Sequence, residues 1–179
     1  MKALIPLAHA IDRFNDSFGR IAEWAVTASC FISAGNAIVR YGLGLGSNAW
    51  LEIQWYLFAV CVMFGAAQVM RVNEHVRVDL LYSRYSTHTK VYVDIFGYIV
   101  FLMPVMVAMI YYSWPLFLDK FNSGEMSQSA GGLIRWPVVL TLPLGFAMII
   151  AQGVSEVIKR VAWLRNEYQM DTHYERPLQ

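Results

Sequence analysis

Redox, metal or haem chemistry depends on cysteine and histidine side chains, and this sequence offers six of them. They are His9, His75, His88, His173, Cys30 and Cys61. Haem in a helical membrane protein needs histidines on facing helices inside the apolar segments, whereas all four histidines lie outside such segments. The cysteines lie singly inside apolar runs, without a CxxC or Cys/His spacing. The sequence therefore predicts no cofactor, no metal site and no enzymatic activity.

Carboxylates inside a membrane would be the next candidates for chemistry. An ionisable group in mid-membrane is costly, so it usually marks function in a transporter that works alone. Here Glu23 and Glu52 lie at the ends of apolar runs, where each can reach headgroups or water. Glu52 is open to two interpretations, a role at the outer surface or between subunits, and a solvated helix start. We expect spans without buried charge, which is typical of a scaffold.

The elements that position these residues are four long apolar segments. The chain has 179 residues, of which 57% are hydrophobic and 15% charged. Uncharged runs cover residues 24–39, 53–70, 95–112 and 136–155, close to the ~20 residues that a helix needs to cross a bilayer. The sequence predicts an all-α integral membrane protein with spans at about 21–40, 50–72, 91–113 and 136–158, within a membrane domain at 21–160.

The basic residues predict the orientation of these spans. Eleven of the fourteen lie before the first span, between the second and third, or after the fourth. The exceptions are Arg40, Lys120 and Arg135. The positive-inside rule then places both termini and the tail at 161–179 in the cytoplasm. We expect a multi-pass protein of a bacterial inner membrane.

Residues 1–20 are expected to form a separate amphipathic helix. Its apolar positions, which recur every three or four residues, are Leu4, Leu7, Ile11, Phe14, Phe18 and Ile21. Polar residues, among them His9, Asp12 and Asn15, occupy the opposite face. Such a helix either lies in the inner membrane interface or contacts another protein, and the sequence favours neither.

Polar and small residues inside the spans are expected to hold helices together. Gln152 can form hydrogen bonds between helices, and Gly145 allows two helices to approach closely. Pro143 is expected to kink the last span, as Pro104 is in the third. The longest outer loop, predicted at 116–135, contains glycines and serine around a polar stretch, which is typical of an ordered, turn-rich segment.

Two ordered sets of residues resemble a known family. The first is Trp50-Leu-Glu-Ile-Gln-Trp-Tyr, Phe64-Gly-Ala-Ala and Glu74-His-Val-Arg-Val-Asp-Leu-Leu81. The second is Gly124-Glu125, Gly131-Gly132-Leu133, Trp136-Pro137, Leu142-Pro143-Leu144-Gly145-Phe146 and Gln152-Gly153. On a chain with four spans and both ends inside, these sets are similar to the small, DctQ-like permease subunit of tripartite ATP-independent periplasmic (TRAP) transporters, over residues 24–160.

The resemblance implies a complex with a large membrane permease subunit, which carries the substrate and sodium sites, and a soluble periplasmic solute-binding protein. The chain would then be a scaffold in the uptake of organic acids, surrounded by membrane lipids. A net charge of +1 without a basic cluster argues against nucleic acid as a partner. The candidate structural or interface residues are Glu52, Trp55, Glu74, His75, Arg77, Asp79, Glu125, Arg135, Trp136, Pro143, Gly145 and Gln152.

Two alternatives stay open at this point. A membrane anchor subunit of an oxidoreductase would also be a small bundle without its own redox centre, and an autonomous small transporter would work without partners. Within the first motif, Glu74, His75, Arg77 and Asp79 either form a charge-paired knot after the second span or lie in a solvated loop. We favour the knot, because unpaired polar groups near the interface are costly to order.

Overall fold

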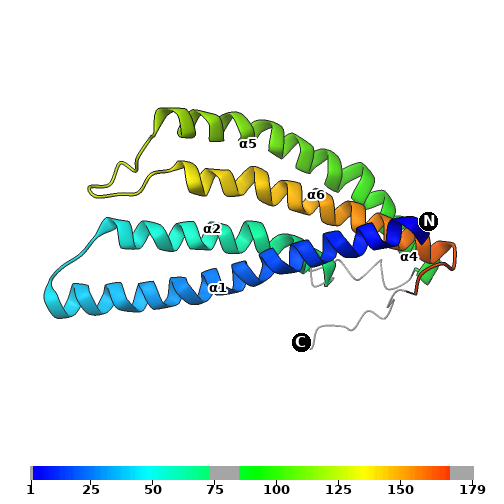
Figure 1. The fold of residues 1–179 in the computed structure, drawn as a ribbon, viewed down its shortest axis with the longest axis horizontal. Helices are drawn as coiled ribbons and strands as arrows, with labels where there is room; N and C mark the ends of the chain where they lie inside the picture. Colours follow the sequence, from blue (N-terminus) through cyan, green and yellow to red (C-terminus); the bar gives the residue numbers. More distant parts are fainter. Residues whose placement is uncertain (1, 73–84, 170–179) are drawn as a thin grey trace.

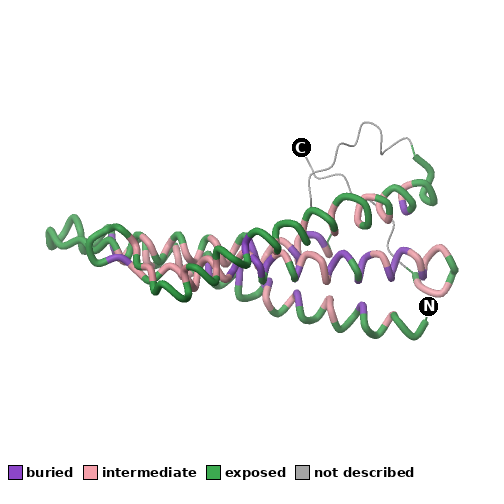
Figure 2. Tube along the Cα trace, turned by 90° about the horizontal axis from the view of Figure 1, so that it is seen from above, coloured by how far each residue is buried: buried purple, intermediate pink, exposed green. Residues whose placement is uncertain are grey.

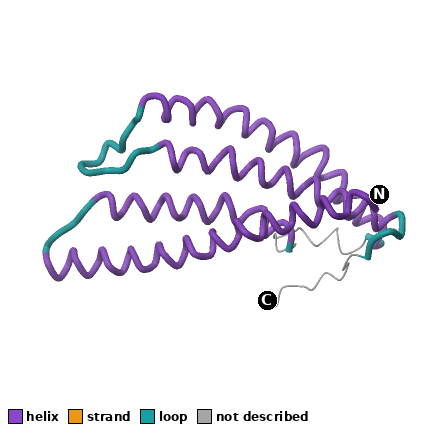
Figure 3. Tube along the Cα trace, in the orientation of Figure 1, coloured by secondary structure: helices purple, strands orange, loops and turns teal. Residues whose placement is uncertain are grey.

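The computed structural model describes residues 2–72 and 85–169, and these residues are almost entirely helical (Figure 3). The helices are η1 (Lys2–Leu4), α1 (Ile5–Leu43), α2 (Asn48–Arg71), α4 (Thr87–Phe96), η2 (Gly97–Leu102), α5 (Met103–Ser123) and α6 (Trp136–Leu164). Within the described ranges, the only β-type pairing is an isolated bridge between Met126 and Ile134. The expected all-α architecture is confirmed.

The long helices lie side by side in the order α1, α2, α6 and α5 (Figure 1). The connections at 44–47 and 124–135 lie at one end of this layer, here termed the loop end. The N-terminus and the last turn of α6 lie at the opposite end, termed the terminal end. Seen edge-on, the helices form a thin layer at the loop end and separate into stacked levels at the terminal end, with the most buried helix in the middle (Figure 2).

Among the described residues, three helical stretches are long and apolar enough to cross a membrane: Asn48–Arg71, Thr87–Ser123 and Trp136–Leu164. Three of the four predicted spans therefore coincide with helices that are able to cross a bilayer. α1 is not among them, because charged residues interrupt much of its length and leave a shorter apolar stretch in its second half. Of the three, α6 is the most enclosed, because 39% of the residues in its most apolar stretch are buried inside the molecule.

α1 joins two segments that were expected to be separate. It runs for 39 residues from Ile5 to Leu43 without a break near residue 20. Its first half packs against α6 through Ala8 and Asn15, both 0% exposed, while Leu7 and Phe14 are about half exposed. Asp12 and Asn15 of the polar face thus point into the molecule, whereas His9 and Arg13 of that face are exposed. The apolar face is divided, because Leu7 and Phe14 point outward while Phe18 packs on Phe64 of α2. The first half of α1 is therefore packed within its own chain, and is not only a surface anchor or a contact site for another protein.

The third predicted span is a longer helix with a widened turn. α4, η2 and α5 run without interruption from Thr87 to Ser123, and η2 is π-helical, with Met103 N–H donating to the carbonyl of Tyr98. Pro104 follows this turn at the start of α5. Because proline has no N–H and its ring crowds the preceding turn, a local π-helical turn accommodates it. The helix ends at Gly124, which has φ of 61°, so the loop begins at residue 124 rather than at 116.

Candidate functional site

At the loop end, a carboxylate of α2 holds the connection between α5 and α6. Glu52 accepts a hydrogen bond from the backbone N–H of Leu133 at 2.7 Å and another from the hydroxyl of Ser127. Both groups belong to the loop at 124–135. The structure therefore places Glu52 in a loop contact within its own chain, so it is more than a solvated helix start, and a role between subunits stays a prediction.

Two further side chains of α2 fix the same loop. Tyr56 donates from its hydroxyl to the carbonyl of Ile134 at 3.0 Å, and the amide of Asn48 donates to the carbonyl of Ala130 at 3.0 Å. Gly132 lies so close to Glu52 that a Cβ there would be 2.9 Å from the carboxylate oxygen, so only glycine fits without displacement. We term the contacts of Asn48, Glu52 and Tyr56 with residues 124–135 the loop clamp.

Glu125 closes the base of the loop by pairing with two cations. Its carboxylate oxygens lie 2.5 Å from Lys120 Nζ and 2.7 Å from Arg135 Nη1. The backbone N–H of Arg135 also donates to the carbonyl of Glu125 at 3.0 Å. Hydrogen bonds from Lys120 and Arg135 lower the pKa of Glu125 below its ordinary value. The two sequence candidates, Glu125 and Arg135, are thus brought together in one ion-pair cluster.

The next candidates lie where α6 meets its neighbours. Trp136, the first residue of α6, contacts Phe121 of α5 edge-to-face with ring centroids 5.5 Å apart. Pro143 is buried inside α6, and Gly145 faces α2. A Cβ on Gly145 would lie 2.7 Å from Met63 Cβ and 2.9 Å from its carbonyl oxygen. Glycine at 145 therefore permits the close approach of α2 and α6 that the sequence predicts.

At the terminal end, Gln152 lies at the centre of a buried polar contact between α1 and α6. It is 0% exposed. Its carbonyl oxygen accepts from Asn15 Nδ2 at 2.7 Å, and its amide nitrogen donates to Asp12 at 2.9 Å and to Glu156 at 3.1 Å. The interhelical role expected for Gln152 is observed, with partners that periodicity alone did not indicate.

Charged groups extend this contact across α6 to α4. Lys159 lies 3.2 Å from Asp12 of α1 and also pairs with Glu156. Arg160 pairs with Glu156 and with Asp94 of α4, at 3.1 Å. The members of this polar core are Asp12, Asn15, Gln152, Ser155, Glu156, Lys159, Arg160 and Asp94. The expectation of spans without buried charge is wrong, because Glu156, Lys159 and Arg160 are buried in α6. They are tolerated there because the three carboxylates and two cations of the core pair with one another across three helices.

Aromatic packing and hydrogen bonds add to the polar core. The guanidinium of Arg160 lies 4.9 Å from the ring centre of Tyr98 in η2, a cation–π contact. Burial would raise the pKa of Asp12, but hydrogen bonds from Gln152 and Ser155 and the charge of Lys159 lower it overall. Among the described residues, no group of three or more His, Cys, Asp and Glu side chains is arranged to hold a metal ion. The core is organised for pairing between helices.

The remaining candidates are not part of these clusters. Trp55 is 77% exposed on α2 and borders a shallow hollow with Gln54 and Phe58. Glu74, His75, Arg77 and Asp79 lie outside the described residues, and the predicted knot stays a prediction.

Sequence reasoning did not select several residues that carry the observed contacts. They are Asp12, Asn15, Tyr56, Asp94, Ser127, Glu156, Lys159 and Arg160. One signal was available: the charges on α6 fall at spacings of three and four, which place Glu156, Lys159 and Arg160 on one face.

Comparison with known proteins identifies the family. No curated protein matches the chain. The family model of the DctQ component of tripartite ATP-independent periplasmic transporters matches residues 29–162, which include the loop clamp and the α6 side of the polar core. The chain therefore belongs to this DctQ family, as an inner-membrane component of a transporter rather than an enzyme.

Proposed function

We propose that the chain is the stationary membrane scaffold of a secondary, sodium-driven TRAP uptake system for organic acids. In this role it supports the large permease subunit, and its loop end faces the periplasm, where the binding protein docks. α1 then forms a fourth span, with both termini in the cytoplasm. At 39 residues it is about 58 Å long, more than the ~30 Å of hydrocarbon that it has to cross.

The polar core is the observation that best supports a scaffold. Asp12, Glu156 and Asp94 are paired with Lys159 and Arg160, so these charges stabilise contacts between α1, α6 and α4. Separating α1 from α6 would leave Asp12 without Lys159, and separating α4 from α6 would leave Asp94 without Arg160, and an uncompensated buried charge is strongly unfavourable. Such an arrangement resists sliding of these helices against one another, and this is what a partner that moves in the bilayer requires of its support.

The loop clamp supports docking at the periplasmic face. It holds residues 124–135 in one conformation on α2, and an ordered surface binds a partner without the cost of ordering a loop. Glu125, Lys120 and Arg135 present charge at this surface. Charge at the rim of an interface mainly changes the association rate and its salt dependence. Reversal of Glu125 to lysine is expected to weaken docking most at low salt, measured by surface binding of the solute-binding protein to the reconstituted complex.

Reconstitution tests the scaffold function directly. Proteoliposomes would contain this chain alone, the large subunit alone, or both, each with binding protein and an inward sodium gradient. We expect sodium-dependent uptake of an organic acid only with both subunits. Uptake by this chain alone, or full uptake by the large subunit without it, would contradict the proposal.

A further inference from the structure

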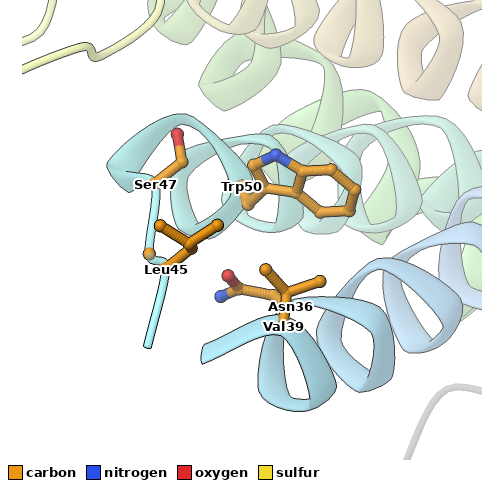
Figure 4. Close-up of a pocket in the computed structure, with 6 residues that line it drawn as sticks. Asn36, Val39, Leu45, Ser47 and Trp50 are labelled. Carbon is orange, nitrogen blue, oxygen red and sulfur yellow. The ribbon is translucent and has the colours of Figure 1, made fainter. Parts of the chain in front are cut away.

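A small cavity opens at the loop end between α1 and α2. Its volume is about 230 Å³. It is lined by Asn36 and Val39 of α1, Leu45, Gly46 and Ser47 of the connection, and Trp50 of α2 (Figure 4). Val39, Leu45 and the Trp50 ring make most of its wall apolar. Neither the loop clamp nor the polar core includes any of these residues.

Asn36 is the unusual member of this lining. Its side chain points into the cavity (Figure 4), it is 8% exposed, and it has no hydrogen-bond partner among the described residues. An amide with no partner in the protein and little contact with water is poorly hydrogen-bonded, which is unfavourable. An occupant that brings a hydrogen-bond acceptor or donor to Asn36 would remove this penalty.

Arg40 adds a charge above the cavity. It follows Asn36 by four residues, so it lies one turn nearer the loop end on the same side of α1, about 6 Å further along the axis. It is exposed and has no ion-pair partner in the described part of the chain. The other two cations near this end, Lys120 and Arg135, both pair with Glu125. The position thus favours an anionic group directly above the amide.

We propose that this cavity binds one glycerophospholipid of the membrane leaflet at the loop end. The amide nitrogen of Asn36 donates to an ester carbonyl, and Arg40 binds the phosphate. The first methylene groups of an acyl chain lie against the Trp50 ring. The Trp50 ring lies beside Gly35, the amide of Asn36 follows, and Arg40 lies one turn nearer the loop end. This is the order of acyl chain, ester and phosphate towards the surface of a leaflet. The charge requirement favours a lipid over an uncharged side chain from a neighbouring helix.

The test compares lipids that differ in one group. The full-length chain is purified in mild detergent, stripped of lipid, and titrated with phosphatidylglycerol in ester-linked and ether-linked forms by native mass spectrometry. The ether lipid keeps the phosphate but has no carbonyl to accept from Asn36. We expect the wild-type chain to bind the ester lipid about three- to tenfold more tightly, the value of one hydrogen bond.

Two variants assign the effect to residues. Asn36→Leu is expected to abolish the preference for the ester lipid. Arg40→Gln is expected to weaken the binding of both lipids about fivefold at low salt while keeping that preference. Ser33→Leu, an exposed position one turn away, is the matched control and should behave as wild type.

Several results would overturn the proposal. Equal binding of ester and ether lipids by the wild-type chain would do so even if Asn36→Leu failed to fold. A preference that persists in folded Asn36→Leu would also contradict it. If Asn36→Leu instead lowers assembly with the large subunit without changing lipid binding, the occupant is a helix of that subunit and the lipid assignment is wrong.

Discussion

Lys159 of α6 lies 3.2 Å from the carboxylate of Asp12 in α1, a contact between residues 147 positions apart in the chain. Both side chains are largely enclosed, with exposed fractions of 9% for Lys159 and 13% for Asp12. This pair decides which way the first half of α1 faces. Because Asp12 finds its partner inside the molecule, Leu7 and Phe14 on the apolar side are left to face outward.

Replacement of Lys159 by methionine is expected to destabilise the chain strongly. Methionine is also long and unbranched, but it leaves Asp12 without its cation and Glu156 with only Arg160. Removing one partner of a buried pair costs about 3–5 kcal/mol. The matched control is Arg20→Met, an exposed cation of α1, which should unfold as the wild type does. Thermal unfolding in detergent measures both, and an unchanged unfolding temperature for Lys159→Met would refute the buried pairing.

Acid should weaken the polar core only at low pH. The pKa of Asp12 is lower in the folded chain than the value of about 3.9 expected when unfolded. A group with a lowered folded pKa contributes stability above its unfolded pKa, and this stability is lost as the pH falls through the folded pKa. The contribution of Asp12, taken as the difference in unfolding temperature between the wild type and Asp12→Asn, should therefore stay constant from pH 7 to about 4. A marked shrinkage of this difference between pH 7 and 5 would count against the assignment.

Gly145 should not tolerate even one added methyl group. In Gly145→Ala the new Cβ would overlap Met63 and force α2 and α6 apart. Overpacking of this kind costs typically about 1–3 kcal/mol. Gly42→Ala is the control, because a Cβ there meets nothing within 4 Å. The yield of folded monomer by size-exclusion chromatography should fall for Gly145→Ala alone, and equal yields would argue against close packing at this point.

Loss of the Glu52 carboxylate should free the loop while leaving the helices in place. Glu52→Ala removes the acceptor for the Leu133 N–H and the Ser127 hydroxyl. Hydrogen exchange of residues 124–135 is expected to accelerate, whereas the centre of α2 should remain protected. Glu23→Ala removes an exposed carboxylate from α1 and serves as the control. If the loop exchanges equally slowly in both variants, Glu52 does not hold it.

The sequence predicted the helices better than it predicted how they face. The spans predicted at 50–72 and 136–158 overlap α2 and α6, because bilayer thickness constrains the length of a span, but α6 continues beyond its predicted end to Leu164. The amphipathic pattern of residues 4–21 was also correct as a helix. Its inward face was not predictable, since periodicity separates two faces but does not state which one is buried when the surroundings are apolar.

The contacts within each cluster depend on pairings between distant residues. Arg160 and Asp94 are 66 positions apart, and no local pattern relates them. The start of the loop was expected at residue 116, whereas α5 continues through Pro115 to Ser123. The family resemblance was confirmed over residues 29–162. By contrast, roles for Trp55 and for the turn at residues 74–79 stay predictions.

The most direct test of the scaffold is uptake per assembled complex in a variant of its polar core. Gln152→Leu removes the hydrogen bonds to Asn15, Asp12 and Glu156 without removing a charge. Proteoliposomes would contain the complete transporter, quantified for assembled complex by size-exclusion chromatography, with uptake measured over a series of sodium and substrate concentrations. We predict fewer assembled complexes, each with unchanged KM and sodium dependence. Full assembly with a shifted sodium response would show that this chain takes part in coupling and would contradict the scaffold assignment.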